Sequence, residues 1–130
     1  MAQLRRLTDG VWAAGQIGLA DLEAAKALGV TLVVGNRPDG EDPGQPTAAQ
    51  TEATARALGL DYRHIPIVGR PSAEQVGAVR AALDEADGGV LLYCRSGMRS
   101  AAAWAMGEPR PREAVLADAA GAGFNLAGVL

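Results

Sequence analysis

The chain has 130 residues, of which 48% are hydrophobic and 21% charged, and its net charge is −3. These values fit one globular domain spanning residues 1–130 and exclude the fibrous and disordered classes. The acidic balance argues against nucleic acid or an anionic membrane as a partner, and no apolar run approaches the roughly 18 residues of a membrane span. Because the first ten residues lack the apolar core of a secretory signal, we expect a cytoplasmic protein.

Strand-like and helix-like segments alternate along the chain. The predicted strands are apolar or β-branched runs at 11–15, 30–34, 61–67 and 90–93. The predicted helices cover 19–28, 47–58, 72–86, 100–106 and 113–120, and two of them begin with capping-box pairs, Thr47 with Gln50 and Ser72 with Gln75. This alternation predicts an α/β fold of three layers, with a mostly parallel central sheet of about four to five strands and helices on both faces.

Two loops of unusual content follow predicted strands. NRPDGEDPGQP, residues 36–46, comes after the strand at 30–34, and CRSGMR, residues 94–99, comes after the strand at 90–93. Ligands of parallel sheets bind beyond the carboxyl ends of the strands. We therefore expect the two loops to meet at one edge of the sheet and to form the functional site.

Cys94 is the only cysteine, and it lies where a predicted strand turns directly into a helix. Backbone N–H groups of residues 95–100 can converge on its sulfur, and Gly97 permits the positive φ that such a turn needs. These donors, the helix N-terminus and Arg99 favour a thiolate nucleophile, to which Ser100 is expected to donate a further hydrogen bond. An inert buried cysteine is the alternative, but it would gain nothing from the neighbouring arginines.

The other candidate residues are assigned from their positions. Arg37 can face the same edge as Cys94, whereas Asp39, Glu41 and Asp42 are interpreted as turn residues of a solvated loop. His64 is interpreted as a structural residue. One histidine with one cysteine does not supply a zinc site, so neither a metal nor a cofactor is predicted. The predicted anion-binding residues are Arg95, Ser96, Gly97, Met98, Ser100 and Arg37.

The segment YCRSGMRS resembles the active-site loop of single-domain rhodaneses and the Cys-x5-Arg-Ser/Thr loop of cysteine-dependent tyrosine and dual-specificity phosphatases. Together with GQIGLADL, VVGNRPDGEDPGQPT and HIPIVG, it resembles the rhodanese/phosphatase-like domain at the N-terminus of beta-lactamase hydrolase-like proteins, a small bacterial sulfurtransferase family. The resemblance runs from about Leu7 to the end of the chain. It implies a cysteine-phosphatase-like (dual-specificity phosphatase-like) fold, and a persulfide dioxygenase or a thioredoxin-like acceptor that would act in trans.

Loop length distinguishes two activities at this point. Arg99 lies one position closer to Cys94 than the phosphatase pattern places its arginine, and Tyr93 stands where that pattern usually has histidine. The shorter ring is expected to fit one sulfane sulfur better than three phosphoryl oxygens, and Val68-Gly69-Arg70 after HIPI holds no general acid. We therefore predict a sulfurtransferase that moves sulfur from thiosulfate or a persulfide through a Cys94 persulfide to a thiol or cyanide.

Two alternatives stay open. One is a cysteine-dependent phosphatase that acts on a phosphate ester through a Cys94 phosphocysteine, with Asp39 as the first candidate for its general acid. The other is a non-enzymatic module that binds an anion. In either enzyme Cys94 and Arg99 are the predicted catalytic residues, with Arg99 directed back across the loop and Arg95 directed toward its mouth.

Overall fold

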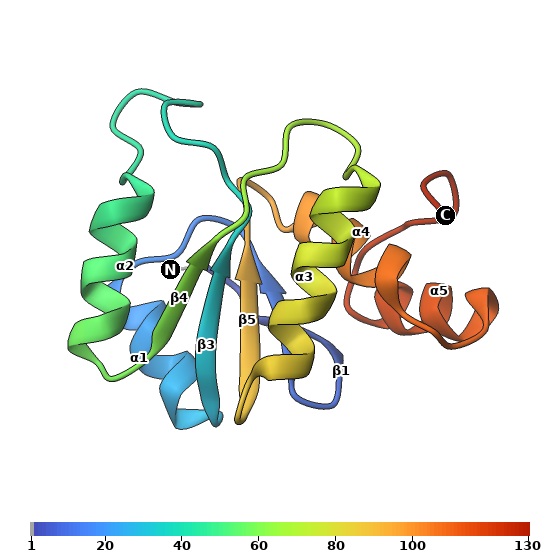
Figure 1. The fold of residues 1–130 in the computed structure, drawn as a ribbon, viewed down its shortest axis with the longest axis horizontal. Coiled ribbons are helices and arrows are strands. Elements are labelled where there is room, and N and C mark those ends of the chain that lie inside the picture. The colour runs from blue at the N-terminus through green and yellow to red at the C-terminus, as the bar shows by residue number, and fades with distance from the viewer. Residues whose placement is uncertain (1) are drawn as a thin grey trace.

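A computed structural model describes residues 2–130 as a five-stranded sheet between two layers of helices (Figure 1). The strands are β1 (Arg5–Thr8), β2 (Val11–Ala14), β3 (Val30–Gly35), β4 (Asp61–His64) and β5 (Gly89–Tyr93). The helices are α1 (Leu19–Ala27), α2 (Ala48–Ala57), α3 (Ala73–Glu85), α4 (Met98–Gly107) and α5 (Arg112–Gly121). The α/β class and the layered sheet predicted from the sequence are confirmed.

The strand order is β1-β2-β5-β3-β4, and every neighbouring pair is parallel except β1 with β2. Strand β1 was not predicted, because RRLT buries only Leu7 and gives no apolar alternation. Its signal was the dipeptide Asp9-Gly10, which joins Thr8 to its partner Val11 as a two-residue hairpin turn. The order places β5, the strand that precedes Cys94, in the middle of the sheet.

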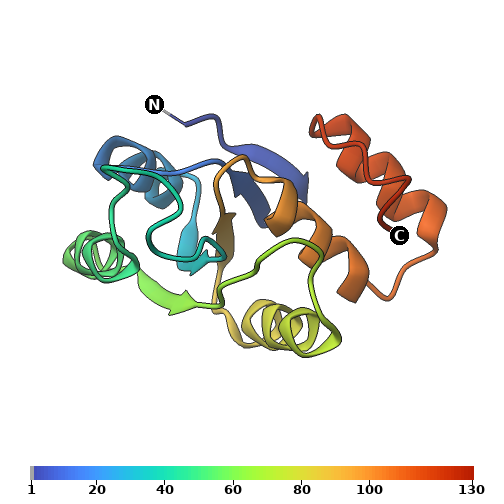
Figure 2. The ribbon, with the colours of Figure 1, turned by 90° about the horizontal axis from the view of Figure 1, so that it is seen from above.

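The two faces of β5 are covered by different helices. Val90 and Leu92 belong to the apolar cluster that includes α4 and α5 residues, whereas Leu91 and Tyr93 belong to the cluster that includes α1 and α2 residues. Figure 2 shows α1 and α2 on one side of the sheet, and α3 and α4 on the other. Burial on both faces explains why the sequence of this strand is continuously apolar rather than alternating.

The element ends agree with the capping signals in the sequence. Thr47 and Ser72 accept hydrogen bonds of 3.1 Å from the backbone N–H groups of Gln50 and Gln75, as the two capping boxes predict. Helix α4 begins at Met98, earlier than predicted, because Gly97 at φ 93° already turns the chain into it. Only residues 94–97 separate β5 from α4.

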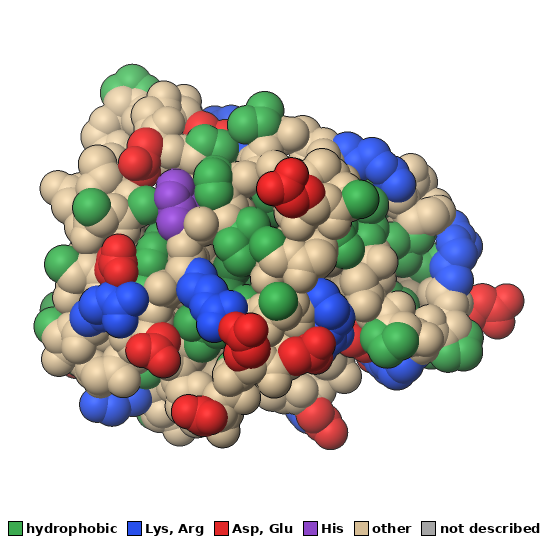
Figure 3. Space-filling model, viewed as in Figure 1, with side chains coloured by type: hydrophobic (Ala, Val, Ile, Leu, Met, Phe, Trp, Pro, Cys, Tyr) green, Lys and Arg blue, Asp and Glu red, His purple; other side chains and the backbone are tan. Residues whose placement is uncertain are grey.

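The surface carries charges of both signs. On the face seen in Figure 3, acidic and basic side chains are interspersed, without a large area of one sign. Among the helices of residues 2–130, none is long and apolar enough to cross a membrane.

Candidate active site

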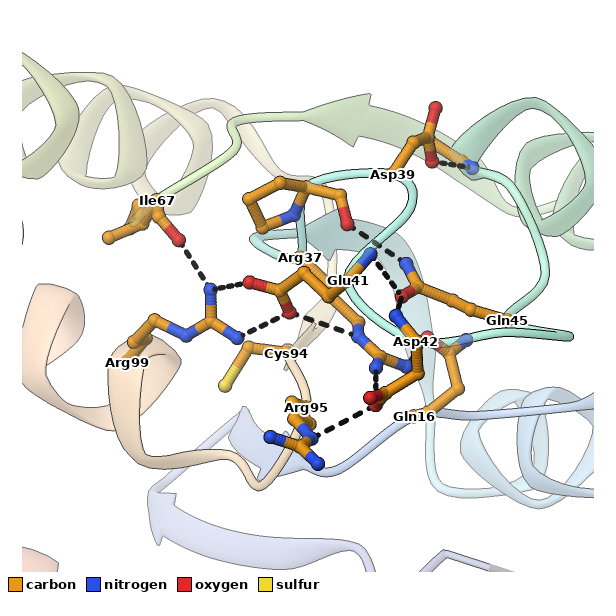
Figure 4. A network of polar contacts seen from close by, with 12 residues as sticks. Gln16, Arg37, Asp39, Glu41, Asp42, Gln45, Ile67, Cys94, Arg95 and Arg99 are labelled. Carbon is orange, nitrogen blue, oxygen red and sulfur yellow. Dashed lines mark hydrogen bonds and ion pairs between the residues drawn. The ribbon is translucent and has the colours of Figure 1, made fainter. Parts of the chain in front are cut away.

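The candidate site lies at the carboxyl edge of the sheet, where loops leave β2, β3, β4 and β5 (Figure 4). Cys94 is the first residue after β5 and is fully buried. Its backbone N–H donates to Ala14 O of β2 at 3.2 Å, and the backbone N–H of Asn36, after β3, donates to Tyr93 O at 2.8 Å. The neighbouring strands thus fix the backbone on both sides of the cysteine.

The loop after β5 folds over the sulfur. The backbone N–H of Gly97 donates to Cys94 Sγ at 3.1 Å. Gly97 has φ 93°, and an added Cβ would lie 3.0 Å from the Phe124 ring, so glycine is required for backbone conformation and for space. An N–H donor and the N-terminus of α4, which starts at Met98, are groups that stabilise a thiolate.

Ser100 does not bind the sulfur, contrary to the sequence-based expectation. Its Oγ donates to Asn36 Oδ1 at 2.8 Å, and Asn36 Nδ2 donates to Ile65 O at 2.9 Å. Both polar side chains are completely buried. Sequence reasoning missed Asn36, although a polar residue that directly follows a buried apolar strand was a usable signal. Asn36 joins the loops after β3 and β4 to the first turn of α4.

Arg99 holds a bidentate ion pair beside the cysteine. Its Nη1 and Nη2 donate to the two carboxylate oxygens of Glu41 at 2.8 and 2.7 Å, and Nη1 also donates to Ile67 O at 2.6 Å. Pairing with Glu41 raises the pKa of Arg99, and the neighbouring Cys94 side chain raises it further. The guanidinium fork therefore holds two oxygens of an anion next to the sulfur.

Glu41 and Asp42 lie in a turn segment that water still reaches, as interpreted from the sequence, but they also bind arginines, which the sequence did not predict. The buried Arg37 donates to Glu41 Oε1 at 3.2 Å, to Asp42 Oδ2 at 2.6 Å and to Gln16 Oε1 at 3.1 Å. Arg95 Nε lies 3.0 Å from the same Asp42 oxygen, with its side chain 66% exposed. A buried guanidinium needs anionic partners, and this loop supplies them.

The Glu41 carboxyl is ionised in this arrangement. Its hydrogen bonds to Arg99, and secondarily those to Arg37, hold the pKa of the carboxyl below its ordinary value. Its side chain is 24% exposed, so water still reaches the pair. In Figure 4 the Glu41 carboxylate lies against the Arg99 guanidinium on the side of Cys94. An anionic group of the protein thus fills the position that an anionic ligand of Arg99 would take.

Other predicted residues lie elsewhere around the site. Asp39 Oδ1 accepts a hydrogen bond of 2.7 Å from the backbone N–H of Ala48 at the start of α2, and its side chain points away from Cys94 (Figure 4). Ser96 and Met98 are exposed at the mouth of the loop. His64 Nε2 lies 3.0 Å from Arg37 O, which fits its interpretation as a structural residue.

Tyr93, the residue before the cysteine, faces the opposite side of β5. Its hydroxyl lies 2.6 Å from the Tyr62 hydroxyl, and burial raises the pKa of both phenols. The two hydroxyls fill the space beside Gly35, where a larger residue would collide with them. Tyr93 therefore supports the strands under the site and does not take part in it.

A mostly parallel sheet with a cysteine after its middle strand and an arginine on the next helix is the arrangement expected of a cysteine-phosphatase-like fold. The chain belongs to the family of the beta-lactamase hydrolase-like protein, phosphatase-like domain, whose model matches residues 3–111. The beta-lactamase hydrolase-like protein of Agrobacterium fabrum is 36% identical over 104 residues, which are 79% of this chain. The chain spans only 24% of the length of that relative.

Solved structures agree with this assignment. A candidate phosphatase from Neisseria meningitidis superposes with a TM-score of 0.86 and 28% identity, over 96% of this chain and 92% of that one. A cysteine-to-serine variant of P. aeruginosa TpbA, solved in complex with phosphotyrosine, superposes with a TM-score of 0.66 and 20% identity, over 90% of this chain and 75% of that one. The second similarity concerns the fold alone.

The predicted sulfurtransferase activity is wrong. The matching family is phosphatase-like, and the similar structures are described as phosphatases, so the rhodanese assignment has no support. Loop length alone did not distinguish the two activities, and Arg99 binds both oxygens of a carboxylate from its position on α4. Thiosulfate, persulfides and a thioredoxin-like acceptor were inferred from that activity and lose their basis with it, and the persulfide dioxygenase, inferred from the resemblance, has no support in the comparisons.

Proposed function

We propose that this domain is a cysteine-dependent phosphatase that hydrolyses phosphate monoesters through a phosphocysteine at Cys94. One observation carries the proposal: the thiol that receives the Gly97 N–H at 3.1 Å lies beside an arginine whose fork holds two anionic oxygens. Phosphoryl transfer to sulfur requires a nucleophile and, beside it, a group that binds the phosphoryl oxygens.

The geometry supports a two-step reaction. Two phosphoryl oxygens take the place of the Glu41 carboxylate on Arg99, and the third faces the backbone of the loop that follows Cys94. Cys94 Sγ attacks phosphorus, the S–P bond forms, and the ester oxygen leaves. Water then attacks phosphorus, the S–P bond breaks, and inorganic phosphate leaves while the thiolate is restored.

The proposed substrate class is a phosphate monoester that projects from a larger molecule. The phosphotyrosine bound to the TpbA variant supports an aryl phosphate as the first compound to test. Arg95, whose side chain is 66% exposed, is placed to attract such an anion to the mouth of the loop. Because Cys94 is fully buried, the loop that carries Glu41 must move aside when the substrate enters.

The proposal is tested with 4-nitrophenyl phosphate. The wild-type chain should release nitrophenolate, and rapid acid quenching should show one phosphoryl group on the peptide that contains Cys94. Cys94→Ser should abolish both signals, whereas Glu85→Gln, which alters an exposed pair with Arg63, should keep them. A wild-type chain that binds inorganic phosphate but neither turns over nor becomes phosphorylated would be an anion-binding module instead.

A further inference from the structure

We propose that Glu41 is the proton-transfer residue of this phosphatase reaction, and that its pairing with Arg99 is a resting position from which the substrate phosphate displaces it. The inference rests on the proposed function. An ester with a poorly stabilised leaving group needs a proton on its departing oxygen, and the donor must stand across phosphorus from the attacking sulfur. The donor must therefore be a carboxyl group that can reach the departing ester oxygen.

The positions of the acidic residues leave Glu41. The segment after β4, residues 65–72, contains no Asp or Glu. In the loop after β3, Asp39 accepts a hydrogen bond from the backbone N–H at the start of α2. Asp42 pairs with Arg37 and Arg95. Of the carboxylates in that loop, Glu41 is the one bound to Arg99, the arginine that also adjoins Cys94. Arg99 therefore places the acid and the nucleophile around one position for phosphorus.

Substrate binding would convert Glu41 into an acid. At rest Arg99 and Arg37 face its carboxylate, and Gln45 Oε1 accepts a hydrogen bond from its backbone N–H at 3.1 Å. A phosphate dianion that takes over Arg99 removes the stronger partner and adds negative charge beside the carboxyl. Both changes favour the protonated form, with the proton taken from solvent. Glu41 is thus protonated, and able to donate a proton, only when a substrate is bound.

The steps balance in protons and electrons. As the S–P bond forms, the P–O ester bond breaks, and its electron pair goes to the ester oxygen, which takes the proton from Glu41. In the second step the Glu41 carboxylate accepts a proton from the attacking water, and the S–P bond breaks to return the Cys94 thiolate. Glu41 is then protonated, and it returns this proton to solvent as phosphate leaves, which restores the carboxylate that pairs with Arg99.

Two substrates that differ only in their leaving group test the proposal in Glu41→Gln. The value of kcat/KM for phenyl phosphate, which reports the steps up to departure of the leaving group, should fall by about 10²-fold, the usual size of a general-acid contribution. The value of kcat/KM for 4-nitrophenyl phosphate should fall much less, because nitrophenolate leaves without a proton. Inorganic phosphate should inhibit the variant at lower concentration than wild type, since an internal competitor for Arg99 has been removed. Glu85→Gln is the matched control on an exposed pair.

Each outcome is decisive. Equal losses of kcat/KM on both substrates, or weaker inhibition by phosphate, would overturn the role of Glu41 while leaving the proposed phosphatase intact. A larger loss on phenyl phosphate than on 4-nitrophenyl phosphate in Asp39→Asn or Asp42→Asn, and not in Glu41→Gln, would assign the general acid to that aspartate. A wild-type chain that hydrolyses neither ester overturns the proposed function and this inference with it. If Glu41→Gln does not fold, Glu41→Asp serves instead: its shorter side chain should release Arg99 yet keep part of the phenyl phosphate rate.

Discussion

Ser100 Oγ donates a hydrogen bond of 2.8 Å to Asn36 Oδ1 across the middle of the sheet edge, where neither side chain is accessible to water. Asn36 in turn donates to Ile65 O at 2.9 Å. The loop that carries Glu41, the loop after β4 and the first turn of α4 are thereby fixed to one another. The Arg99–Glu41 pair and the Arg99 bond to Ile67 O depend on this alignment.

Ser100→Ala should lower the free energy of unfolding by about 1–3 kcal/mol, because it leaves Asn36 Oδ1 buried without a donor. Urea unfolding of the single variants Ser100→Ala and Asn36→Ala and of the double variant measures this. In the double variant the loss should be smaller than the sum of the single losses. Strictly additive losses would show that the two side chains do not depend on each other.

Gly35→Ala should destabilise the domain, by about 1–3 kcal/mol, because the added Cβ would overlap the Tyr62 hydroxyl and lie 2.9 Å from the Tyr93 hydroxyl. Removal of one hydroxyl in Gly35→Ala/Tyr62→Phe should recover part of the loss in thermal unfolding. Gly77→Ala is the opposite control, since its Cβ meets nothing within 4 Å on α3. It should stabilise by about 0.5–1 kcal/mol.

Phe124→Ala should cost about 3–5 kcal/mol in urea unfolding, because the ring is buried against Gly97 and lies under the Arg5 guanidinium, 5.8 Å from the ring centroid. Val68→Ala, at a side chain that is 78% exposed, should change the stability by less than about 0.5 kcal/mol. Similar small losses in both variants would mean that the segment after α5 does not support the loop over Cys94.

The two loop arginines should differ in their effect on turnover. Arg99→Lys should lower kcat/KM for 4-nitrophenyl phosphate by about 10²-fold, because an ammonium cannot hold two oxygens in a fork. Arg95→Lys should raise KM by about threefold or less and leave kcat unchanged, because its charge acts through water at the mouth of the loop. The reverse ranking would contradict the placement of the phosphate on Arg99.

The Glu41 ion pair should make stability depend on pH in one direction. Arg99 lowers the pKa of Glu41 in the folded chain from its ordinary value of 4.5, so the folded state favours the carboxylate. The stability gained is fully present above that ordinary value and is lost as the pH falls through the lowered one. The difference in free energy of unfolding between wild type and Glu41→Gln should therefore shrink below pH 4.5. A difference that grows on acidification would contradict the ion pair.

Local patterns in the sequence determined the layers of the fold and the position of the nucleophile. The runs at 30–34 and 90–93 are continuously apolar because both faces of those strands are covered. The capping boxes that begin at Thr47 and Ser72 each lie within four consecutive residues and mark the start of a helix. Cys94 and Gly97 were likewise identified from adjacent residues, since a thiol at the junction of a strand and a helix is a local feature.

Only the tertiary structure decided which charges meet at the thiol. Glu41 and Arg99 are 58 positions apart, and they meet because the strand order places β3 directly beside β5. Spacing along the chain does not reveal that order, so the pairing of Glu41 and Asp42 with arginines was not predicted and Asn36 was missed. The same limit led the length of one loop to favour sulfur transfer, because a residue count does not show that Arg99 turns back to donate to both carboxylate oxygens of Glu41.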